Sequence, residues 1–278
     1  MSFRTGEISM SSRPTLAAAI ITYNEEENIQ ACLDSVTDFV DEIVVLDSIS
    51  TDATKEICLK NSKVKFFEHP FDDYKKQKNR AAEKCSTEWI LSLDADERVS
   101  AELRRSIEAF IKDNPDISGA KFPRLVQYLN RDIRHSGWYP NQRYRLFRKG
   151  DAFWERDVLH EKLILKGRGT SLMGDLIHLT VKDLSDHANN VNRFSSIAAL
   201  GRYNKGKDFS LFRLIFKPPG AFIETYLLKL GLLDGMQGFI IAVFAAYYVF
   251  LREAKMFELS VIKSDKPSNL SEQYKKER

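Results

Sequence analysis

Two aspartates separated by a single residue, Asp94 and Asp96, follow the apolar run 89–93. Carboxylates with this spacing at the end of a strand can project from a tight turn and hold a divalent cation, which in turn binds a diphosphate. An isolated pair of this kind is more often a surface turn or a helix cap, here before Ser100. The context favours the metal site, because the pair follows an apolar strand and comes after two other polar strand ends.

The two earlier polar clusters also stand where apolar runs end. Short apolar runs that lead into turn residues predict buried strands. Strands that alternate with helices predict an α/β fold with a mostly parallel sheet and helices on both faces. Ligands of such sheets bind outside the carboxyl ends of the strands, so the clusters are expected to converge on one crevice. The clusters are Thr22, Tyr23, Asn24 and Glu25 at the end of run 15–22, and Asp47 and Ser48 at the end of run 42–46.

The other elements follow from the same periodicities. Strands are predicted over residues 15–22, 42–46, 64–67 and 89–93. Helices are predicted over residues 28–36, 50–60 and 74–84, and from Ser100 onward. After residue 115, short strands over residues 119–124, 143–148 and 162–165 predict a mixed sheet region. Beyond Asp183 the pattern is helical, and Pro218-Pro219-Gly220 is predicted to break it.

The composition predicts one catalytic domain with an appendage. A chain of 278 residues with 43% hydrophobic content can bury one full core and still carry an extension. The net charge of +3 is too small to favour a nucleic-acid partner. The three cysteines lack CxxC spacing and no secretion signal is evident, which predicts a reducing cytosol. The predicted ranges are a leader over 1–13, a catalytic domain over 14–182, a helical amphipathic region over 183–262 and a polar tail over 263–278.

The helical region combines basic and apolar residues. This pattern predicts peripheral contact with anionic lipids at the inner face of the cytoplasmic membrane. The alternative is an amphipathic helix packed on the catalytic domain or on a second subunit. The longest charge-free apolar run, 239–251, is predicted to be too short to span a bilayer, which takes about 20 residues. The basic residues are Arg202, Lys205, Lys207, Arg213 and Lys217.

Several ordered motifs together carry a resemblance to a known family. The chain resembles family 2 glycosyltransferases in Thr22-Tyr23-Asn24-Glu25, Asp47-Ser48, Gln77-Lys78-Asn79 and Asp94-Ala95-Asp96. It resembles the branch with lipopolysaccharide inner-core β-1,4-glucosyltransferases in His135-Ser136-Gly137-Trp138-Tyr139-Pro140, Arg145-Leu146-Phe147 and Val158-Leu159-His160-Glu161. The resemblance covers nearly the whole chain and implies a GT-A fold followed by the helical extension.

The resemblance implies an inverting hexosyltransferase that moves glucose from UDP-glucose onto a heptose of the lipopolysaccharide inner core. Alternatives are the same chemistry on a polypeptide, polyprenyl-linked or capsule acceptor, or a noncatalytic nucleotide-binding scaffold. A nucleotidyltransferase is disfavoured, because a glycine-free acidic segment follows the first strand where such enzymes carry a glycine-rich phosphate loop.

The resemblance also assigns roles to residues. Asp47 would bind the base of the nucleotide, Thr22 and Glu25 would line the nucleoside pocket, and Tyr23, Asn24 and Ser48 stand beside them. Lys78 and Arg80 would face phosphate. Asp94, Ala95 and Asp96 would contact the nucleotide-sugar and a divalent metal, Mg or Mn. His178 could complete the metal coordination as a neutral imidazole, and a packing histidine is the alternative.

The general base must be a carboxylate that can reach the acceptor hydroxyl. Glu161 is predicted for this role, with Glu97 and Asp157 as alternatives and a surface glutamate as the non-catalytic interpretation. Trp138, Tyr139 and Trp154 either stack on acceptor sugar rings or belong to the core. Ile49 stands where many relatives of the family carry glycine. A β-branched residue resists positive φ, so the loop is predicted to take a more extended path.

Overall fold

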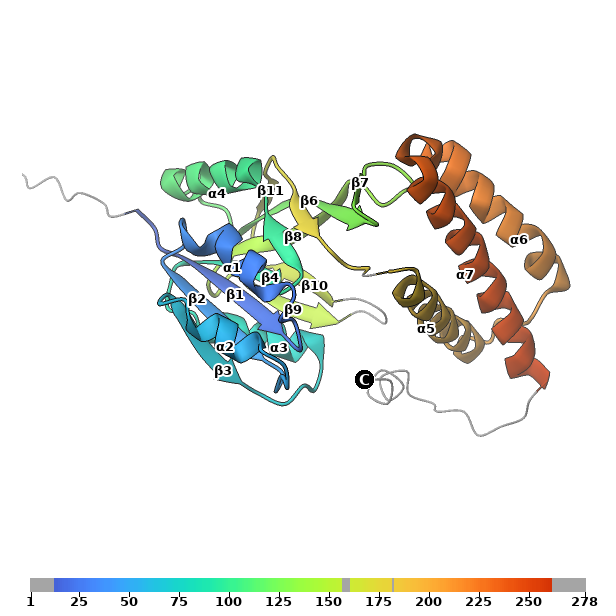
Figure 1. The fold of residues 1–278 in the computed structure, drawn as a ribbon, viewed down its shortest axis with the longest axis horizontal. Helices are drawn as coiled ribbons and strands as arrows, with labels where there is room; N and C mark the ends of the chain where they lie inside the picture. The colour runs from blue at the N-terminus through green and yellow to red at the C-terminus, as the bar shows by residue number, and fades with distance from the viewer. Residues whose placement is uncertain (1–12, 157–160, 182, 262–278) are drawn as a thin grey trace, which may run out of the picture. The chain divides into compact units, whose positions relative to one another are not determined.

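The computed structural model describes residues 13–156, 161–181 and 183–261, and it divides the chain into two units (Figure 1). The first unit comprises the described residues up to Phe122 together with Gln142–Leu176. The second comprises Pro123–Asn141 and the described residues from Ile177 onward. Residues 123–141 therefore group with the C-terminal helices, whereas the predicted ranges place them in the catalytic domain. The predicted domain boundaries stay a prediction.

The first unit is built on a parallel sheet with the strand order β3-β2-β1-β4. Helices alternate with these strands along the chain, which confirms the predicted α/β fold. The strand ends lie within about one residue of the predicted ones. The elements are β1 (Leu16–Thr22), α1 (Ile29–Thr37), β2 (Glu42–Asp47), α2 (Thr54–Leu59), β3 (Val64–Glu68), α3 (Tyr74–Lys84) and β4 (Trp89–Asp94).

Strand β1 shows why this sheet needs helices on both faces. All seven of its residues are buried. Since successive side chains point to opposite faces, Ala18 and Ile20 lie in one hydrophobic cluster while Ala19 and Ile21 lie in the other. Residues of α1 belong to the first cluster and Ala81 of α3 belongs to the second. This arrangement confirms the prediction of helices on both faces.

The second half of the first unit adds antiparallel strands, as the mixed-sheet prediction requires. Strand β8 (Asn141–Arg148) pairs with β4, and β6 (Gly119–Tyr128), β12 (Leu176–His178) and β5 (Glu97–Val99) follow it in the sheet. Helix α4 (Ala101–Asp113) begins after Ser100, whose hydroxyl accepts a hydrogen bond from the Leu103 amide at 3.2 Å. The remaining strands are β9 (Ala152–Arg156) and β10 (Glu161–Leu165), which form a separate ribbon, β11 (Gly169–Ser171), and β7 (Arg131–Ile133) of the second unit.

The second unit is mainly helical, and a predicted break within it is wrong. Helix α6 continues through Pro218 and Pro219. Each proline removes an amide donor, so the carbonyls four residues earlier lose their helical partners. None of the residues of α6 is fully buried, so those carbonyls are not sealed in a core. The helical elements are α5 (Leu184–Asn204), α6 (Leu211–Ile223), η1 (Glu224–Leu228), η2 (Gly231–Asp234) and α7 (Gly235–Val261).

The apolar segment near the C-terminus forms a longer helix than predicted. Residues 239–251 lie inside α7, and Gly231–Val261 is a helical stretch of 31 residues that is long and apolar enough to cross a membrane by length and composition. The prediction that this segment is too short is therefore wrong, because the flanking residues extend the helix beyond the charge-free run. Length and composition alone do not distinguish a membrane helix from a packed one.

The loop after β2 also departs from its prediction. Ile49 has φ +66°, so the extended path predicted for it is wrong. Three hydrogen bonds enforce the turn: the Asp47 carboxylate accepts from the Ser50 amide at 2.6 Å and from the Ser50 hydroxyl at 2.5 Å, and the Ser48 amide donates to the Thr22 carbonyl at 2.9 Å. The Ile49 side chain is 49% exposed, which keeps its branched carbons away from packed neighbours. The loop thus holds a β-branched residue in a strained conformation.

Replacing Ile49 with glycine should relieve this strain. We expect Ile49→Gly to raise the free energy of unfolding by about 0.5–1 kcal/mol, since the left-handed penalty exceeds the entropic cost of glycine. Urea unfolding of the purified variant measures the change. Ile49→Val, which keeps the β-branch, should leave the stability unchanged; a glycine variant less stable than the wild type would contradict the strain argument.

Candidate active site

The register of the parallel strands brings the predicted polar clusters to one edge of the sheet. Thr22, at the end of β1, is the partner of Asp47 at the end of β2. On the other side of β1, Ile21 is the partner of Asp94 at the end of β4. The three strand ends are therefore neighbours, which confirms their predicted convergence at the carboxyl edge.

Asp94 lies between two cations. The Lys78 ammonium is 2.9 Å from one of its carboxylate oxygens, and the Arg145 guanidinium is 2.8 Å from the other. Arg145 also lies 2.8 Å from the carboxylate of Glu97, which accepts a hydrogen bond from the Asp94 amide at 2.9 Å. The side chains of Lys78 and Arg145 are both 5% exposed and that of Glu97 is 0% exposed. The group is a network of two cations and two carboxylates in which the side chain of Asp94, 25% exposed, is the one that solvent reaches.

The electrostatics of this network fix its charge state. Burial by itself would raise the pKa of Asp94, but Arg145 and Lys78 outweigh it and hold that pKa well below its usual range. Burial would lower the pKa of Arg145, but Asp94 and Glu97 outweigh it and raise that pKa. Asp94 is therefore a carboxylate at any physiological pH, and its negative charge is already matched by two cations.

Trp154 lies beneath both cations. Its ring centroid is 4.6 Å from the Lys78 ammonium and 5.4 Å from the Arg145 guanidinium carbon. The side chain of Asn79 holds its backbone, donating to the Trp154 carbonyl at 3.0 Å and accepting from its amide at 2.9 Å. Trp154 is 4% exposed, an environment that suits a residue that positions cations. Its predicted contact with an acceptor sugar stays a prediction.

The end of β1 contains a buried hydroxyl that has no partner in the part of the chain that the structure describes. Thr22 is 5% exposed, and its Oγ1 has no hydrogen-bond partner among the described residues. Buried hydroxyl groups in native structures are normally paired, so an unpaired one beside Asp47 fits a group that waits for a ligand. Asp47 is 1% exposed and spends both carboxylate oxygens on Ser50.

The neighbouring predicted residues tie two loops together. The Asn24 amide donates to the Ser50 hydroxyl, and the Glu25 amide donates to Thr54 Oγ1, each at 2.8 Å. The hydroxyl of Ser48 accepts a hydrogen bond from Gln77 at 3.1 Å. Tyr23 is 47% exposed at the same edge. These contacts make the first two strand-end loops one rigid rim, and the nucleotide contacts assigned to these residues stay predictions.

Arg80, in α3, contacts Asp72, which precedes that helix. Its two terminal nitrogens each lie 2.8 Å from an oxygen of Asp72, a bidentate pair that holds the pKa of Asp72 well below its usual range. The phosphate contact predicted for Arg80 stays a prediction, and Lys78 is the better-placed cation, since it pairs directly with Asp94.

Glu161 begins β10 and is half-buried. In the ribbon of β9 and β10, Leu163 is the partner of Trp154, and Glu161 is the partner of Arg156. Residues two apart on a strand share a face, so Glu161 lies on the same face of the ribbon as Trp154. That face carries the ring that contacts Lys78 and Arg145, which places the predicted base on the side of the charged network.

The alternative bases fare differently. Glu97 is 0% exposed and paired with Arg145, so an acceptor hydroxyl has no route to it. Asp157 lies outside the described residues. His178, Trp138 and Tyr139 belong to the second unit, where His178 is buried at the end of β12 and the two aromatic residues are half-buried. Their predicted roles stay predictions.

The carboxylates at the end of β4 fit a divalent cation whose remaining ligands come from the substrate. Within the described ranges, no group of three or more His, Cys, Asp or Glu side chains could hold a metal ion. A divalent cation that also binds a diphosphate takes only one or two carboxylates from the protein. Asp96, half-buried next to the network, has the right ligand type for that arrangement. Asp96 is therefore a candidate ligand, whereas a metal at Asp94 would have to displace Lys78 or Arg145.

Arg145 is the central residue that the role assignments missed, although the motif Arg145-Leu146-Phe147 was noted. A lone arginine inside a strand pattern gives no sign that it will be buried between two carboxylates.

We expect Arg145→Gln to lower the free energy of unfolding by about 3 kcal/mol, because it leaves Glu97 and Asp94 buried with too little positive charge. Chemical unfolding should show the loss. Arg148→Gln, three residues along β8 and partly exposed, is the control and should cost far less; equal losses would contradict the argument.

Comparison with known proteins decides the family. Residues 18–162, just over half of the chain, match the family described as Glycosyl transferase family 2. The chain belongs to glycosyltransferase family 2. This family 2 glycosyltransferase is 29% identical to the lipopolysaccharide core biosynthesis glycosyltransferase LpsC of Rhizobium meliloti, over 90% of the chain and 94% of LpsC. It is 31% identical to the uncharacterized glycosyltransferase RT0209 of Rickettsia typhi, over 88% of each protein.

A solved structure supports the fold. The mannosyltransferase PcManGT from Pyrobaculum calidifontis, solved in complex with GDP-Man and Mn²⁺, superimposes with a TM-score of 0.51 at 13% identity. The superposition covers 89% of this family 2 glycosyltransferase and 88% of PcManGT. At this identity the likeness concerns the fold alone. The predicted GT-A fold and the enzyme class, a glycosyltransferase, are thus confirmed.

Proposed function

We propose that this glycosyltransferase transfers a hexose, glucose from UDP-glucose, onto a heptose of the lipopolysaccharide inner core with inversion at the anomeric carbon. The observation that carries the proposal is the register that makes Thr22, Asp47 and Asp94 neighbours at the carboxyl edge of the sheet. The similarity to LpsC, whose name places it in lipopolysaccharide core biosynthesis, supports the acceptor class.

The nucleoside binds at the β1 and β2 ends in this proposal. The unpaired Thr22 hydroxyl supplies a hydrogen bond to it, and the Asp47 carboxylate, the predicted partner of the base, is held rigidly by Ser50. The diphosphate lies toward the β4 end, near Lys78 and Arg145. Lys78 and Arg145 are paired with Asp94 and Glu97, so most of the charge that offsets the leaving diphosphate would come from the proposed metal.

Asp96, with Asp94 nearby, holds the proposed divalent metal, Mg or Mn. When bound, such an ion offsets the charge that develops on the leaving nucleoside diphosphate. Glu161 takes the proton of the acceptor hydroxyl while the oxygen of that hydroxyl forms its bond to the anomeric carbon and the bond to the diphosphate breaks. His178, Trp138 and Tyr139 belong to the second unit, and their predicted roles as metal ligand and acceptor contacts stay predictions, as does that of Trp154.

The helical unit is proposed to contact a membrane at the cytoplasmic face. Large apolar side chains are exposed along α6, among them Phe212 at 66% and Phe216 at 60%, and Arg213 and Lys217 lie between and after them. Exposed apolar side chains with basic neighbours are typical of interfacial helices.

We expect the purified protein to float with vesicles that contain phosphatidylglycerol at low salt. Recovery of all the protein in the soluble fraction would contradict the membrane contact and favour a subunit interface.

The acceptor is tested in the organism itself. If the proposal is correct, deletion of the gene truncates the lipopolysaccharide inner core, and mass spectrometry shows the loss of one hexose. The gene encoding Asp96→Ala should fail to restore the mass, whereas the wild-type gene restores it. Intact lipopolysaccharide in the deletion strain would contradict this acceptor and favour a polypeptide, polyprenyl-linked or capsule acceptor.

A further inference from the structure

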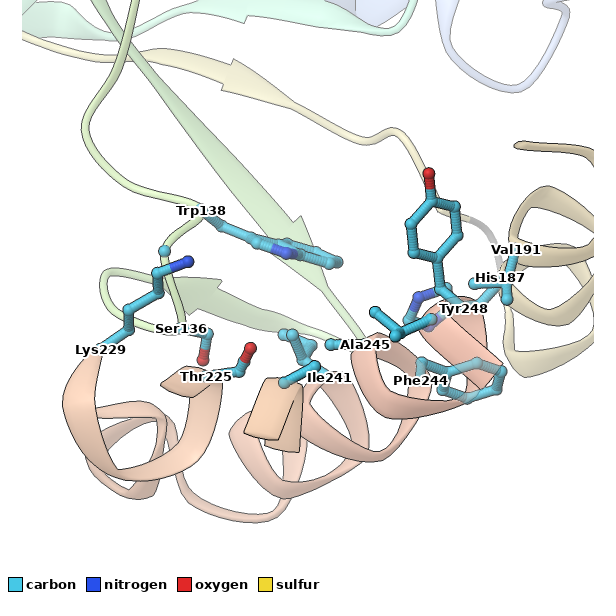
Figure 2. Close-up of a pocket in the computed structure, with 13 residues that line it drawn as sticks. Ser136, Trp138, His187, Val191, Thr225, Lys229, Ile241, Phe244, Ala245 and Tyr248 are labelled. Carbon is cyan, nitrogen blue, oxygen red and sulfur yellow. The ribbon is translucent and has the colours of Figure 1, made fainter. Parts of the chain in front are cut away.

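The helical unit contains a pocket of about 340 Å³, and none of the roles assigned to the donor site uses it (Figure 2). Helix α7 supplies one continuous wall, because its lining residues recur at helical spacing. Helix α5 adds His187 and Val191, four residues apart. The α7 wall consists of Ile241, Phe244, Ala245, Tyr248 and Val249.

The loop with the His135-Ser136-Gly137-Trp138 motif forms another part of the pocket wall. Asp234, 2% exposed, accepts hydrogen bonds from the His135 amide at 3.1 Å and the Ser136 hydroxyl at 2.7 Å. Gly137 has φ +76°, and a Cβ atom there would lie 2.6 Å from the Lys229 side chain. The positive φ favours glycine at this position. The motif therefore holds Trp138 in the pocket wall, which gives it a role outside the donor site.

The two ends of the pocket differ in polarity. Figure 2 shows Ser136, Thr225 and Lys229 at one end, with His187, Phe244 and Tyr248 at the other. His187 stacks on Phe244 with ring centroids 4.0 Å apart, and burial lowers the pKa of His187, so its ring stays neutral. Among the described residues that line the pocket, Lys229 alone then carries a charge at neutral pH. The pocket is amphipathic, with a cationic end and an apolar end.

The cationic end can accept an anion from outside. The Lys229 side chain is 45% exposed, and its partner Glu224, 2.8 Å away, is 55% exposed. Exposed ion pairs of this kind contribute little, so the ammonium can exchange Glu224 for a ligand phosphate. Beside the pocket wall, α7 also carries exposed apolar residues at helical spacing, which continue the apolar surface outward: Phe239, Val243, Tyr247 and Phe250.

We infer that this pocket binds the hydrocarbon chain of a phosphate-bearing lipid, with the chain against Ile241 and Phe244 and the phosphate at Lys229. A chain with an anionic head matches both ends at once, whereas a free anion or a neutral hydrocarbon matches only one. The inference goes beyond the proposed sugar transfer and does not rest on it. Binding is measured without donor, metal or acceptor, so its failure and the failure of the proposed function are distinguishable.

The probe is a dodecyl phosphate with bromine at the end of its chain, below its micellar concentration. Bromine quenches tryptophan fluorescence on contact, and the protein has three tryptophans. Trp89 and Trp154 are 0% and 4% exposed in the first unit, so Trp138 is the residue that reports on the pocket. We expect saturable quenching by the full-length protein. Inorganic phosphate should not displace the probe, and displacement by phosphate alone would reduce the site to an anion site and overturn the inference.

Two variants and a control locate the binding. Ala245→Phe fills the pocket and should weaken binding more than about tenfold, because a filled pocket has no room for the chain. Val243→Phe adds the same kind of bulk to an exposed position of α7, 42% exposed in the wild type, and should bind normally. Equal quenching in the wild type, Ala245→Phe and Val243→Phe would place the probe on the outer apolar surface and overturn the inference.

Lys229→Gln tests the charged end and keeps the test valid if Ala245→Phe does not fold. It should weaken the binding of the phosphate probe about fivefold to tenfold and leave the binding of a brominated dodecyl maltoside unchanged. Unchanged binding of the phosphate probe would overturn the assignment of Lys229. Displacement of the probe by phosphatidylglycerol vesicles would identify a bilayer lipid as the source, and displacement only by a lipid-linked saccharide would identify the acceptor; both results support the site.

Discussion

Asp96→Ala is expected to lower the rate of sugar transfer by at least about a thousandfold, since a bound cation contributes several kcal/mol to the stabilisation of developing charge. Asp96 is the proposed ligand because a metal at Asp94 would have to displace Lys78 or Arg145. The variant should also lose metal-dependent binding of UDP. Calorimetric titration of UDP with and without Mn²⁺, together with steady-state kinetics, measures both effects.

The fold of Asp96→Ala should be intact, whereas a substitution of the neighbouring Asp94 should destabilise the protein. Asp94→Asn removes charge from a buried network and should lower the melting temperature, whereas Asp96→Ala should leave it close to that of the wild type. Asp113→Ala, at the exposed end of α4, is the control for the loss of one surface carboxylate. Near-normal transfer by Asp96→Ala would remove Asp96 from the active site.

Glu161→Gln should lower kcat by about a hundredfold to ten-thousandfold and leave the affinity for UDP unchanged. The amide keeps the size of the side chain and removes only the proton acceptor. Transfer is measured with saturating donor and acceptor, and UDP affinity is measured separately by titration.

Glu155 offers a matched control for this prediction. It lies next to Trp154 on β9, so it faces the opposite side of the ribbon from Trp154 and Glu161, and it is exposed. Glu155→Gln should therefore transfer sugar at the wild-type rate. Loss of UDP binding in Glu161→Gln would instead reassign Glu161 to the nucleotide pocket. An equal loss of sugar transfer in the two variants would show that the face of the ribbon does not determine which glutamate acts as the base.

The sheet and its reactive edge could be predicted because both depend on local patterns. A short apolar run such as 16–22 that ends in turn residues predicts a strand buried on both faces, and parallel strands carry their carboxyl ends to one edge. Thr22, Asp47 and Asp94 therefore meet for reasons visible in the sequence.

The features that were missed or predicted wrongly are those in which specific contacts or context override the preference of a single residue. Ile49 takes positive φ because Asp47 and Thr22 hold the turn, an energy that outweighs the intrinsic preference of a β-branched residue. Arg145 is buried because Asp94 and Glu97 neutralise it, and no local pattern on β8 announces those partners. Helix α6 continues through Pro218 and Pro219, where local preference predicts a break.

The central claim is metal-dependent transfer from a nucleotide-sugar at the carboxyl edge of the sheet. Release of UDP from a panel of UDP-sugars by the purified protein, with and without Mn²⁺ or Mg²⁺ and with lipopolysaccharide inner core as acceptor, tests it most directly. We expect release from UDP-glucose that requires the metal and rises when the acceptor is added. Folded protein that releases no UDP from any sugar in the panel, with metal and acceptor present, would contradict it.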